Sequence, residues 1–286
     1  MAFQLTARGP FSLAAAAKFQ GTFPAFAGPV DDEVVFDLAF PADGAWSTVG
    51  VRMTDDLVGH VTANPGRLPE KEIRAQVERI LSLDVDGTGF AEVGERDPAV
   101  GELQQRFPGL RPVLFPSPYE AAAWALIGHR ISMTQGATLR RRLAEELGDR
   151  VEVGGRELSA FPPPERLARL EPMPGMTIRK VENLRALGDA ASEGELDADL
   201  LRDMPVEEAL AHLKKLPGIG PFSAELTLIR GAGLVDVFPR ETPRLHRAMA
   251  EVYELGPEPP LARLEAIAGA WRPFQAWVAF LLRNAA

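Results

Sequence analysis

The stretch Leu213–Ala224, LKKLPGIGPFSA, decides the fold of this 286-residue chain. A helix is expected to end at Lys215, and a new helix begins directly after a turn in which Gly218 and Gly220 flank Ile219. Both glycines can take positive φ and leave their amides uncovered, while Ile219 would enter the core. These amides, with the free N–H groups of the next helix, suit a phosphate. An ordinary helix corner closed by glycine would show the same spacing.

Helical patterns extend on both sides of this turn, punctuated by glycine or proline. The helices expected beyond residue 118 are 119–130, 134–147, 178–191, 206–213, 223–231, 242–253, 261–270 and 274–283. The segment 107–118, FPGLRPVLFPSP, holds four prolines and a glycine. It predicts a loop and a domain boundary.

The residues before this loop predict a small antiparallel sheet with helices. Runs rich in apolar and β-branched residues at 33–40, 47–53 and 57–62 are typical of strands. Helices are expected around 13–19, 70–81 and 98–106. The predicted fold class is therefore α+β, with an α/β part over residues 1–110 and an all-α part over residues 111–286.

The composition excludes several kinds of protein. With 46% hydrophobic and 25% charged residues, the chain is an ordinary globular protein. The absence of cysteine excludes disulfides, a thiol nucleophile, cysteine-ligated zinc and iron–sulfur clusters. The four histidines lack metal-ligand spacing. No apolar run suits a membrane span or a signal peptide, so we expect a cytoplasmic monomer without a membrane partner.

The charge pattern does not settle the partner. The formal charge of −9 is not typical of a DNA-binding protein. Basic clusters nevertheless occur in the second part of the chain, at Arg140–Arg142, Arg179–Lys180 and Lys214–Lys215. The first of these is either a solvated helix face or a phosphate contact.

Several motifs in a fixed order resemble one family of proteins. They are LPGIGPFSA (216–224), ALIGHRIS (125–132), PGMTIRKVE (174–182), VDVFP (235–239) and WRPF (271–274). Together they resemble the helix-hairpin-helix DNA glycosylases, most closely the 3-methyladenine DNA glycosylase II family. The resemblance covers residues from about 110 to 283, and the strand-rich N-terminal part resembles the accessory domain of that family more loosely.

This resemblance implies a base-excision repair enzyme whose partner is duplex DNA with a damaged base. Such an enzyme flips the modified nucleotide into a cleft and hydrolyses its N-glycosidic bond. The hairpin residues Lys214, Lys215, Gly218, Ile219 and Gly220 would contact the DNA backbone. The resemblance also implies a sodium or potassium ion on the carbonyls of Lys214, Leu216 and Ile219, and no other cofactor.

The chain departs from the family at the catalytic acid. The family's acid stands where this chain has Thr242, a residue type that also suits a helix N-cap. The transition state resembles an oxocarbenium ion and needs a nearby carboxylate. Glu241 is the first candidate to supply it, and Asp236 or Glu225 is the alternative. Without such a group, the chain would be a weak enzyme or a binding protein for damaged or distorted DNA.

The base pocket departs from the family as well. Phe222 stands where bifunctional members carry a lysine nucleophile, which predicts a monofunctional enzyme without strand-nicking activity. Phe222 would either stack on a flipped base or pack in the core with Leu226, one turn further on. Arg283 stands where the family has an aromatic pocket residue. The expected substrates are alkylated or otherwise modified bases.

Two other segments are candidates for contact with the duplex. Pro112, Val113 and Leu114 stand where relatives carry an apolar wedge, although linker packing explains them equally well. His129 replaces a polar residue that relatives direct toward the gap in the duplex, with Arg130 beside it. A histidine that simply ends a helix is the alternative.

Overall fold

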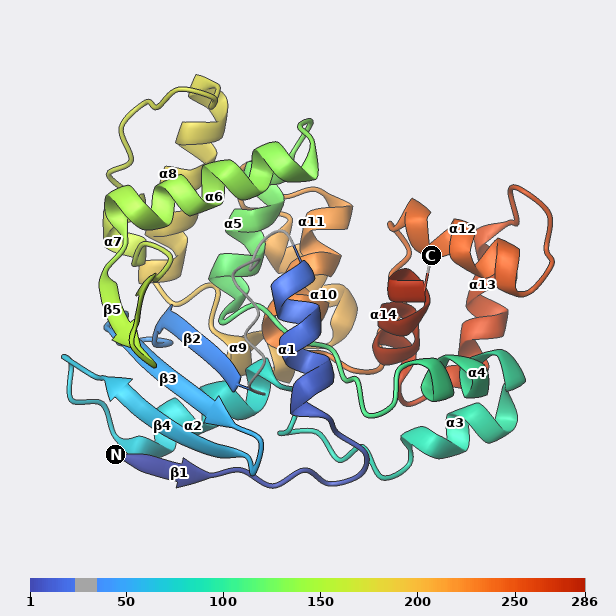
Figure 1. Ribbon diagram of the computed structural model, residues 1–286. Helices are drawn as coiled ribbons and strands as arrows, with labels where there is room; N and C mark the ends of the chain where they lie inside the picture. The colour runs from blue at the N-terminus through green and yellow to red at the C-terminus, as the bar shows by residue number, and fades with distance from the viewer. Residues whose placement is uncertain (24–34, 286) are drawn as a thin grey trace.

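A four-stranded antiparallel sheet forms one side of the molecule (Figure 1). The computed structural model describes residues 1–23 and 35–285. The strand order is β1-β4-β3-β2, with β1 (Ala2–Gln4), β2 (Val35–Pro41), β3 (Thr48–Thr54) and β4 (Val58–Ala63). The predicted sheet is confirmed, although positions 33 and 34 of the first expected strand lie outside the described residues. The sequence does not reveal β1, because three residues are too few to show a period.

A β-hairpin stands within the otherwise helical second part. Strands β5 (Arg150–Val153) and β6 (Arg156–Ser159) are joined by Gly154 and Gly155, whose φ values are 58° and 78°. Two consecutive residues at positive φ match the tight turns that join antiparallel strands, and this Gly-Gly signal is visible in the sequence. Arg156 pairs with Asp37 of β2 at 2.9 Å, so the hairpin extends the sheet side of the molecule.

Most helices agree with the expected ranges. The helices of the described residues are α1 (Leu13–Thr22), α2 (Glu70–Ile80), α3 (Phe90–Arg96), α4 (Pro98–Arg106), α5 (Pro118–Gly128), α6 (Met133–Leu147), α7 (Pro164–Leu167), α8 (Ile178–Ser192), α9 (Ala198–Asp203), α10 (Val206–Leu213), α11 (Pro221–Leu226), α12 (Pro243–Val252), α13 (Leu261–Ala268) and α14 (Gln275–Ala285). The short helices α3, α7 and α9 were not predicted. The helix expected over 223–231 differs, because α11 continues into a π-helical turn, η1 (Thr227–Ala232). A 3₁₀ turn, η2 (Gly269–Trp271), follows α13. Within 1–23 and 35–285, no helix is both long and apolar enough to cross a membrane.

Side-chain caps fix where several of these helices start. Ser117 accepts a hydrogen bond from the backbone of Glu120, and Pro118 occupies the first turn of α5. Ser132 and Gln135 form a reciprocal capping box at α6. Each cap satisfies backbone N–H groups that have no partner inside the helix. The chain between α5 and α6 is therefore a short, sharply defined turn.

Two apolar cores hold the molecule together. One gathers the sheet, α1–α4 and residues from 238–282, whereas the other lies within 119–232. Figure 1 shows α3 and α4 beside α12–α14, away from α5, α6 and α8. In the first core the indole N–H of buried Trp271, in η2, donates to Asp97 at 3.0 Å. Packing thus crosses residue 110, and the division at that point stays a prediction.

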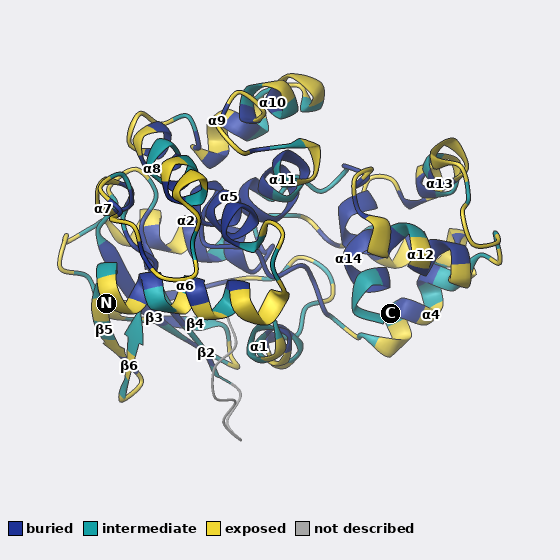
Figure 2. Ribbon diagram, turned by 90° about the horizontal axis from the view of Figure 1, so that it is seen from above, coloured by how far each residue is buried: buried dark blue, intermediate teal, exposed yellow. Residues whose placement is uncertain are grey.

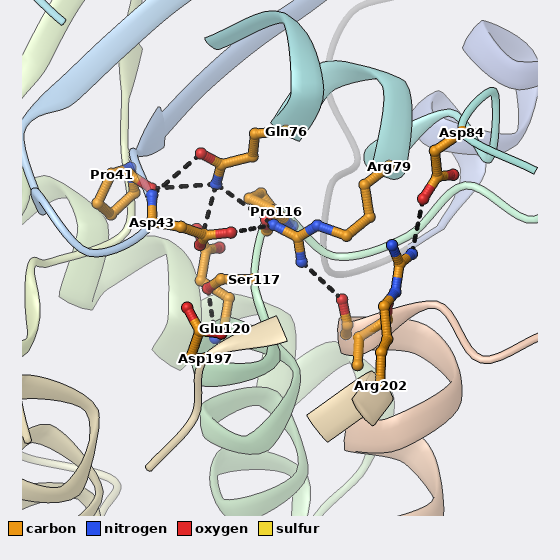
Figure 3. A network of polar contacts seen from close by, with 12 residues as sticks. Pro41, Asp43, Gln76, Arg79, Asp84, Pro116, Ser117, Glu120, Asp197 and Arg202 are labelled. Carbon is orange, nitrogen blue, oxygen red and sulfur yellow. Dashed lines mark hydrogen bonds and ion pairs between the residues drawn. The ribbon is translucent and has the colours of Figure 1, made fainter. Parts of the chain in front are cut away.

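A buried polar network holds the π-helical turn in place (Figure 3). Arg79 of α2 donates to the carbonyl oxygens of Gly231 (3.0 Å) and Pro116 (2.9 Å), and it pairs with Asp43. Arg202 of α9 donates to the carbonyl of Ala232 at 2.5 Å. The end of a helix leaves carbonyls without internal partners, and the two arginines supply donors to them. Elements from both predicted parts therefore fix the segment that carries Arg230.

Candidate active site

A tight turn connects α10 to α11. Lys214 caps α10, and Gly218 takes a φ of +83°. Gly220 is extended instead, with φ −92° and ψ −175°, and precedes Pro221 at the start of α11. Only the first of the two glycines therefore takes the left-handed conformation considered for both. Gly220 does not need it, because a residue before a helix normally has an extended backbone.

The turn is seated on α5 and α8. Ile219 and Leu216 are 6% and 7% exposed and belong to the helical core, so the predicted burial of Ile219 is confirmed. A Cβ on Gly218 would lie 2.2 Å from Nδ2 of Asn183 and 2.8 Å from a methyl group of Leu126. At Gly220, by contrast, no described atom lies within 4 Å of an added Cβ. The backbone at Gly220 is thus open to a ligand.

Basic and polar side chains surround this turn. Lys214 and Lys215 are exposed, as are His129 and Arg130 in the α5–α6 turn. Lys180, at the start of α8, donates to the carbonyl of Ile127 at 2.6 Å and ties α8 to the end of α5. We call residues 129–130, 180 and 214–220 the hairpin face. Its exposed cations and open amides suit an anionic polymer.

The residues predicted to form an apolar wedge are buried. Pro112 is buried, Val113 and Leu114 are 2% and 3% exposed, and Ser82 donates to the carbonyl of Pro112 at 2.6 Å. A wedge has to be exposed before it can enter a base stack. The interpretation of Pro112 and Val113 as DNA contacts is therefore wrong, and linker packing explains them.

A pocket opens between α11–η1 and the pair α12 and α14. It has a volume of about 30 Å³ and is open to solvent. Its lining consists of Phe222, Glu225, Leu226, Ile229, Arg230, Pro239, Thr242, Ala276, Ala279, Phe280 and Arg283. The three predicted base-pocket residues meet here: Phe222 and Leu226 from α11, and Arg283 from α14, which lies far from α11 in the sequence. Phe222 is 43% exposed, which excludes the alternative that it is a buried core residue.

Glu225 is the carboxylate in this pocket. It is 6% exposed, and its two oxygens accept the backbone N–H groups of Arg240 (3.0 Å) and Glu241 (2.9 Å). Burial raises its pKa, while the two amide hydrogen bonds oppose that rise. A buried carboxylate held by two amides is both a clamp on the loop before α12 and a fixed negative charge at the pocket wall.

The other two carboxylate candidates lie outside the pocket. Glu241 is exposed and does not line it; only its backbone N–H reaches Glu225. Asp236 pairs with Arg272 at 2.8 Å and does not line it either. Glu225, which sequence reasoning ranked behind Glu241, is thus the candidate that faces the pocket. No local pattern could reveal this, because α11 and the loop before α12 are brought together by tertiary folding.

Thr242 lines the pocket at the N-terminus of α12. It is 6% exposed and occupies the N-cap position, yet its side chain makes no capping hydrogen bond. Among the described residues its hydroxyl has no hydrogen-bond partner. The cap role considered for Thr242 is therefore wrong for the side chain, which leaves the hydroxyl free for a water or a ligand.

Known proteins share this fold and parts of this sequence. No family model matches the chain. The DNA-3-methyladenine glycosylase of Bacillus subtilis is 29% identical over 216 residues, 74% of this chain and 71% of that protein. DNA-3-methyladenine glycosylase 2 of Escherichia coli is 35% identical over 144 residues, about half of each chain (49% and 50%). The solved 3-methyladenine DNA-glycosylase from Archaeoglobus fulgidus superposes with a TM-score of 0.79 over 99% of this chain and 97% of its own, at 24% identity.

These likenesses concern first the fold and then the sequence. The fold, with its hairpin between α10 and α11 and the pocket beside it, is that of the helix-hairpin-helix DNA glycosylase superfamily. In sequence, the chain is similar to DNA-3-methyladenine glycosylases, at 29% and 35% identity over parts of its length. The resemblance inferred from the motifs is thereby confirmed.

Proposed function

We propose that this protein is a monofunctional DNA glycosylase of base-excision repair that removes a modified base from duplex DNA. The observation that carries this proposal is the pocket beside the hairpin, in which the half-exposed ring of Phe222 lies with the buried carboxylate of Glu225. An aromatic face can stack on a flipped base, and a fixed negative charge can stabilise a cationic sugar. The named relatives are glycosylases, which supports the same class of reaction.

The hairpin face would hold the DNA backbone. Its open amide at Gly220 and its exposed Lys214 and Lys215 suit phosphate oxygens, whose contacts give affinity but no base specificity. His129 and Arg130 are exposed on the same face and would stand against the duplex. Solved glycosylases of similar fold hold DNA in their structures, which supports this partner.

A sodium or potassium ion fits the hairpin. Among the described residues, the carbonyl oxygens of Lys214 and Ile219 accept no hydrogen bond, and that of Leu216 accepts one, from the N–H of Ile219. Carbonyl oxygens are the ligands that such hard cations prefer. A bound cation would supply positive charge next to a phosphate, and the three carbonyls would hold it.

The chemistry in the pocket is hydrolysis. The bond between the sugar C1′ and the base nitrogen breaks, and its electron pair leaves with the base. Water adds through its oxygen to C1′; one of its protons is lost from that oxygen and one proton is gained by the departing base. Glu225 would stabilise the positive charge that develops on the sugar, and the unpartnered hydroxyl of Thr242 would orient the water.

The product would be an intact abasic site. A bifunctional enzyme needs an amine to attack C1′, and Phe222 supplies none. The strand should therefore break only after alkali is added.

The test is incubation of the protein with duplexes that each carry one modified base, either 7-methylguanine or hypoxanthine. We expect free base and an alkali-labile site, with no covalent adduct in the presence of borohydride. A borohydride-trapped adduct would exclude the monofunctional mechanism. Tight binding of damaged duplexes without release of any base would mean that the chain is a binding protein of the same fold.

A further inference from the structure

The pocket wall contains an arginine that has no counterion among the described residues. Arg283 of α14 lines the pocket, and its Nε is buried without a hydrogen-bond partner in the described part of the chain. Burial lowers its pKa, and so does the nearby Arg244. A buried donor without an acceptor is costly, and that cost is relieved when a ligand supplies the acceptor.

A second arginine lies deeper in the same wall. Arg230 of η1 is 5% exposed, donates to the carbonyl of Val113 at 2.5 Å and also lines the pocket. Its Nε likewise has no partner within residues 1–23 and 35–285. Burial, with a smaller contribution from Arg283, lowers its pKa to about 9, so it stays protonated at neutral pH.

Contacts with aromatic rings and a backbone hydrogen bond hold Arg230 in place. Its guanidinium lies 5.1 Å from the ring centre of Phe280 and 5.5 Å from that of Phe19. The backbone of Arg230 is bonded to Phe115, whose N–H donates to its carbonyl at 2.8 Å. Cation–π contacts and the polar network around η1 therefore hold this charge at the pocket and prevent it from turning outward.

The two arginines decide which bases the pocket can accept. Glu225, the one carboxylate among the lining residues that the structure describes, supplies a single negative charge against the two guanidinium charges, and both of its oxygens already accept backbone N–H groups. A base with a positive charge, such as an N3- or N7-alkylated purine, would meet two guanidinium groups at close range. A neutral base with a carbonyl oxygen would instead offer an acceptor to groups that lack one.

We propose that Arg283, supported by Arg230, makes this pocket selective for neutral purines that carry a carbonyl oxygen, such as deaminated adenine, over cationic alkylated purines. This proposal rests on the proposed function, because it names the substrate class of the same pocket. A DNA phosphate offers oxygen acceptors as well. Arg230 is too deeply buried for a backbone phosphate to reach, whereas it lines the pocket that the edge of a flipped base would enter.

The experiment measures binding separately from cleavage. Three duplexes of one sequence carry 2′-fluoro-deoxyinosine, 2′-fluoro-7-methyldeoxyguanosine or 2′-fluoro-deoxyadenosine at the same position, since the fluorine blocks departure of the base. The proteins are wild type, Arg283→Met, Arg283→Lys and a control, Arg106→Met, which changes an exposed arginine of α4. Thermal unfolding of each variant shows whether it is folded.

We expect wild type and Arg106→Met to bind the inosine duplex about 10- to 100-fold more tightly than the other two. Arg283→Met should lose this preference, and Arg283→Lys should keep part of it because it keeps the charge. Wild-type preference for the 7-methylguanine duplex would overturn the proposal. An equal loss of affinity for all three duplexes in Arg283→Met would also overturn it, because the arginine would then bind a phosphate.

The same duplexes without fluorine separate the two proposals. If wild type prefers the inosine duplex but releases neither hypoxanthine nor 7-methylguanine, the selectivity stands and the enzymatic function fails. If it releases 7-methylguanine faster than hypoxanthine and binds it more tightly, the enzymatic function stands and the selectivity fails.

Discussion

Glu225 and Glu241 are neighbours in the fold, but their carboxylates have different surroundings. Glu225 is buried at the pocket wall, whereas Glu241 is exposed and touches it only through its backbone. In the sequence, Glu241 is the obvious substitute for the family's acid because it is next to Thr242. The start of α12 leaves its side chain exposed, and only the folded chain brings Glu225, from the helix after the hairpin, to the same place.

The raised pKa of Glu225 predicts a pH dependence of excision. Burial favours the neutral acid, so the carboxylate loses its charge at a higher pH than an ordinary glutamate does. Because the ionised form stabilises the sugar cation, the single-turnover rate should fall as the pH drops from about 8 to about 5, with an apparent pKa above the usual glutamate range. The measurement is the rate on a hypoxanthine duplex across that range. A rate that stays flat down to the ordinary glutamate range would rule out Glu225 as the group.

Among the elements, the hairpin was largely readable from the sequence and the π-helical turn was not. The Gly-x-Gly spacing and the buried Ile219 follow from local rules. The shape of η1 depends on Arg79 and Arg202, which approach from distant helices. The proline-rich linker has no period that could show which of its residues are buried, so the burial of Val113 could not be distinguished from an exposed wedge.

The hairpin predicts a difference between its two glycines. Gly220→Ala adds a methyl group in open space, so the fold should be unchanged, but the methyl would stand between the amides and a phosphate. We expect the affinity for duplex DNA to fall by a similar factor for every DNA sequence. Gly269→Ala, which also meets no described atom, is the matched control. Titrations against salt and thermal unfolding test this, and unchanged affinity for Gly220→Ala would argue against the amides as the phosphate site.

Gly218→Ala should act differently. Its φ of +83° and the close approach of Asn183 and Leu126 make any side chain strained there. We expect loss of both stability and binding, measured by thermal unfolding and by the same duplex titrations. A variant as stable as wild type would show that the turn can adopt another conformation.

The π-helical turn predicts a large effect of Arg79. Replacing it with Met would leave the carbonyls of Gly231 and Pro116 and the carboxylate of Asp43 without their partner. We expect this to lower the free energy of unfolding by about 3–5 kcal/mol. Arg74→Met, on the same helix in an exposed pair with Glu78, should cost less than about 1 kcal/mol. Denaturant unfolding compares the two variants. If both variants lose the same amount of unfolding free energy, the network does not hold η1 in place.

For the whole molecule, the main difference from the sequence prediction is that elements from both ends of the chain share one apolar core. Strand periods, helix periods and the proline-rich loop indicated an α/β part followed by a helical part, and both kinds of structure are found. Periodicity cannot show which faces meet. The sheet and α1–α4 share a core with α12–α14, which come from the other end of the chain (Figure 2 shows the buried faces of α12 and α14).

This shared core predicts that residues 111–286 do not fold alone. Without the N-terminal residues, Phe238, Leu245 and Trp271 would lose the core that buries them. The isolated segment should show no cooperative thermal transition by circular dichroism, in contrast to the full chain. A sharp transition near that of the full chain would show that the predicted boundary at residue 110 separates independent domains.

The most direct test of the proposed enzyme is a rescue at the pocket wall. Single-turnover excision of hypoxanthine is compared for wild type, Glu241→Gln, Glu225→Gln and the double variant Glu225→Gln with Thr242→Asp. We expect Glu241→Gln to match wild type and Glu225→Gln to be about 10²–10³-fold slower. The double variant should recover activity, because Thr242→Asp returns a carboxylate to the same pocket. Full activity of Glu225→Gln together with loss of activity in Glu241→Gln would show that the reaction depends on the exposed carboxylate instead.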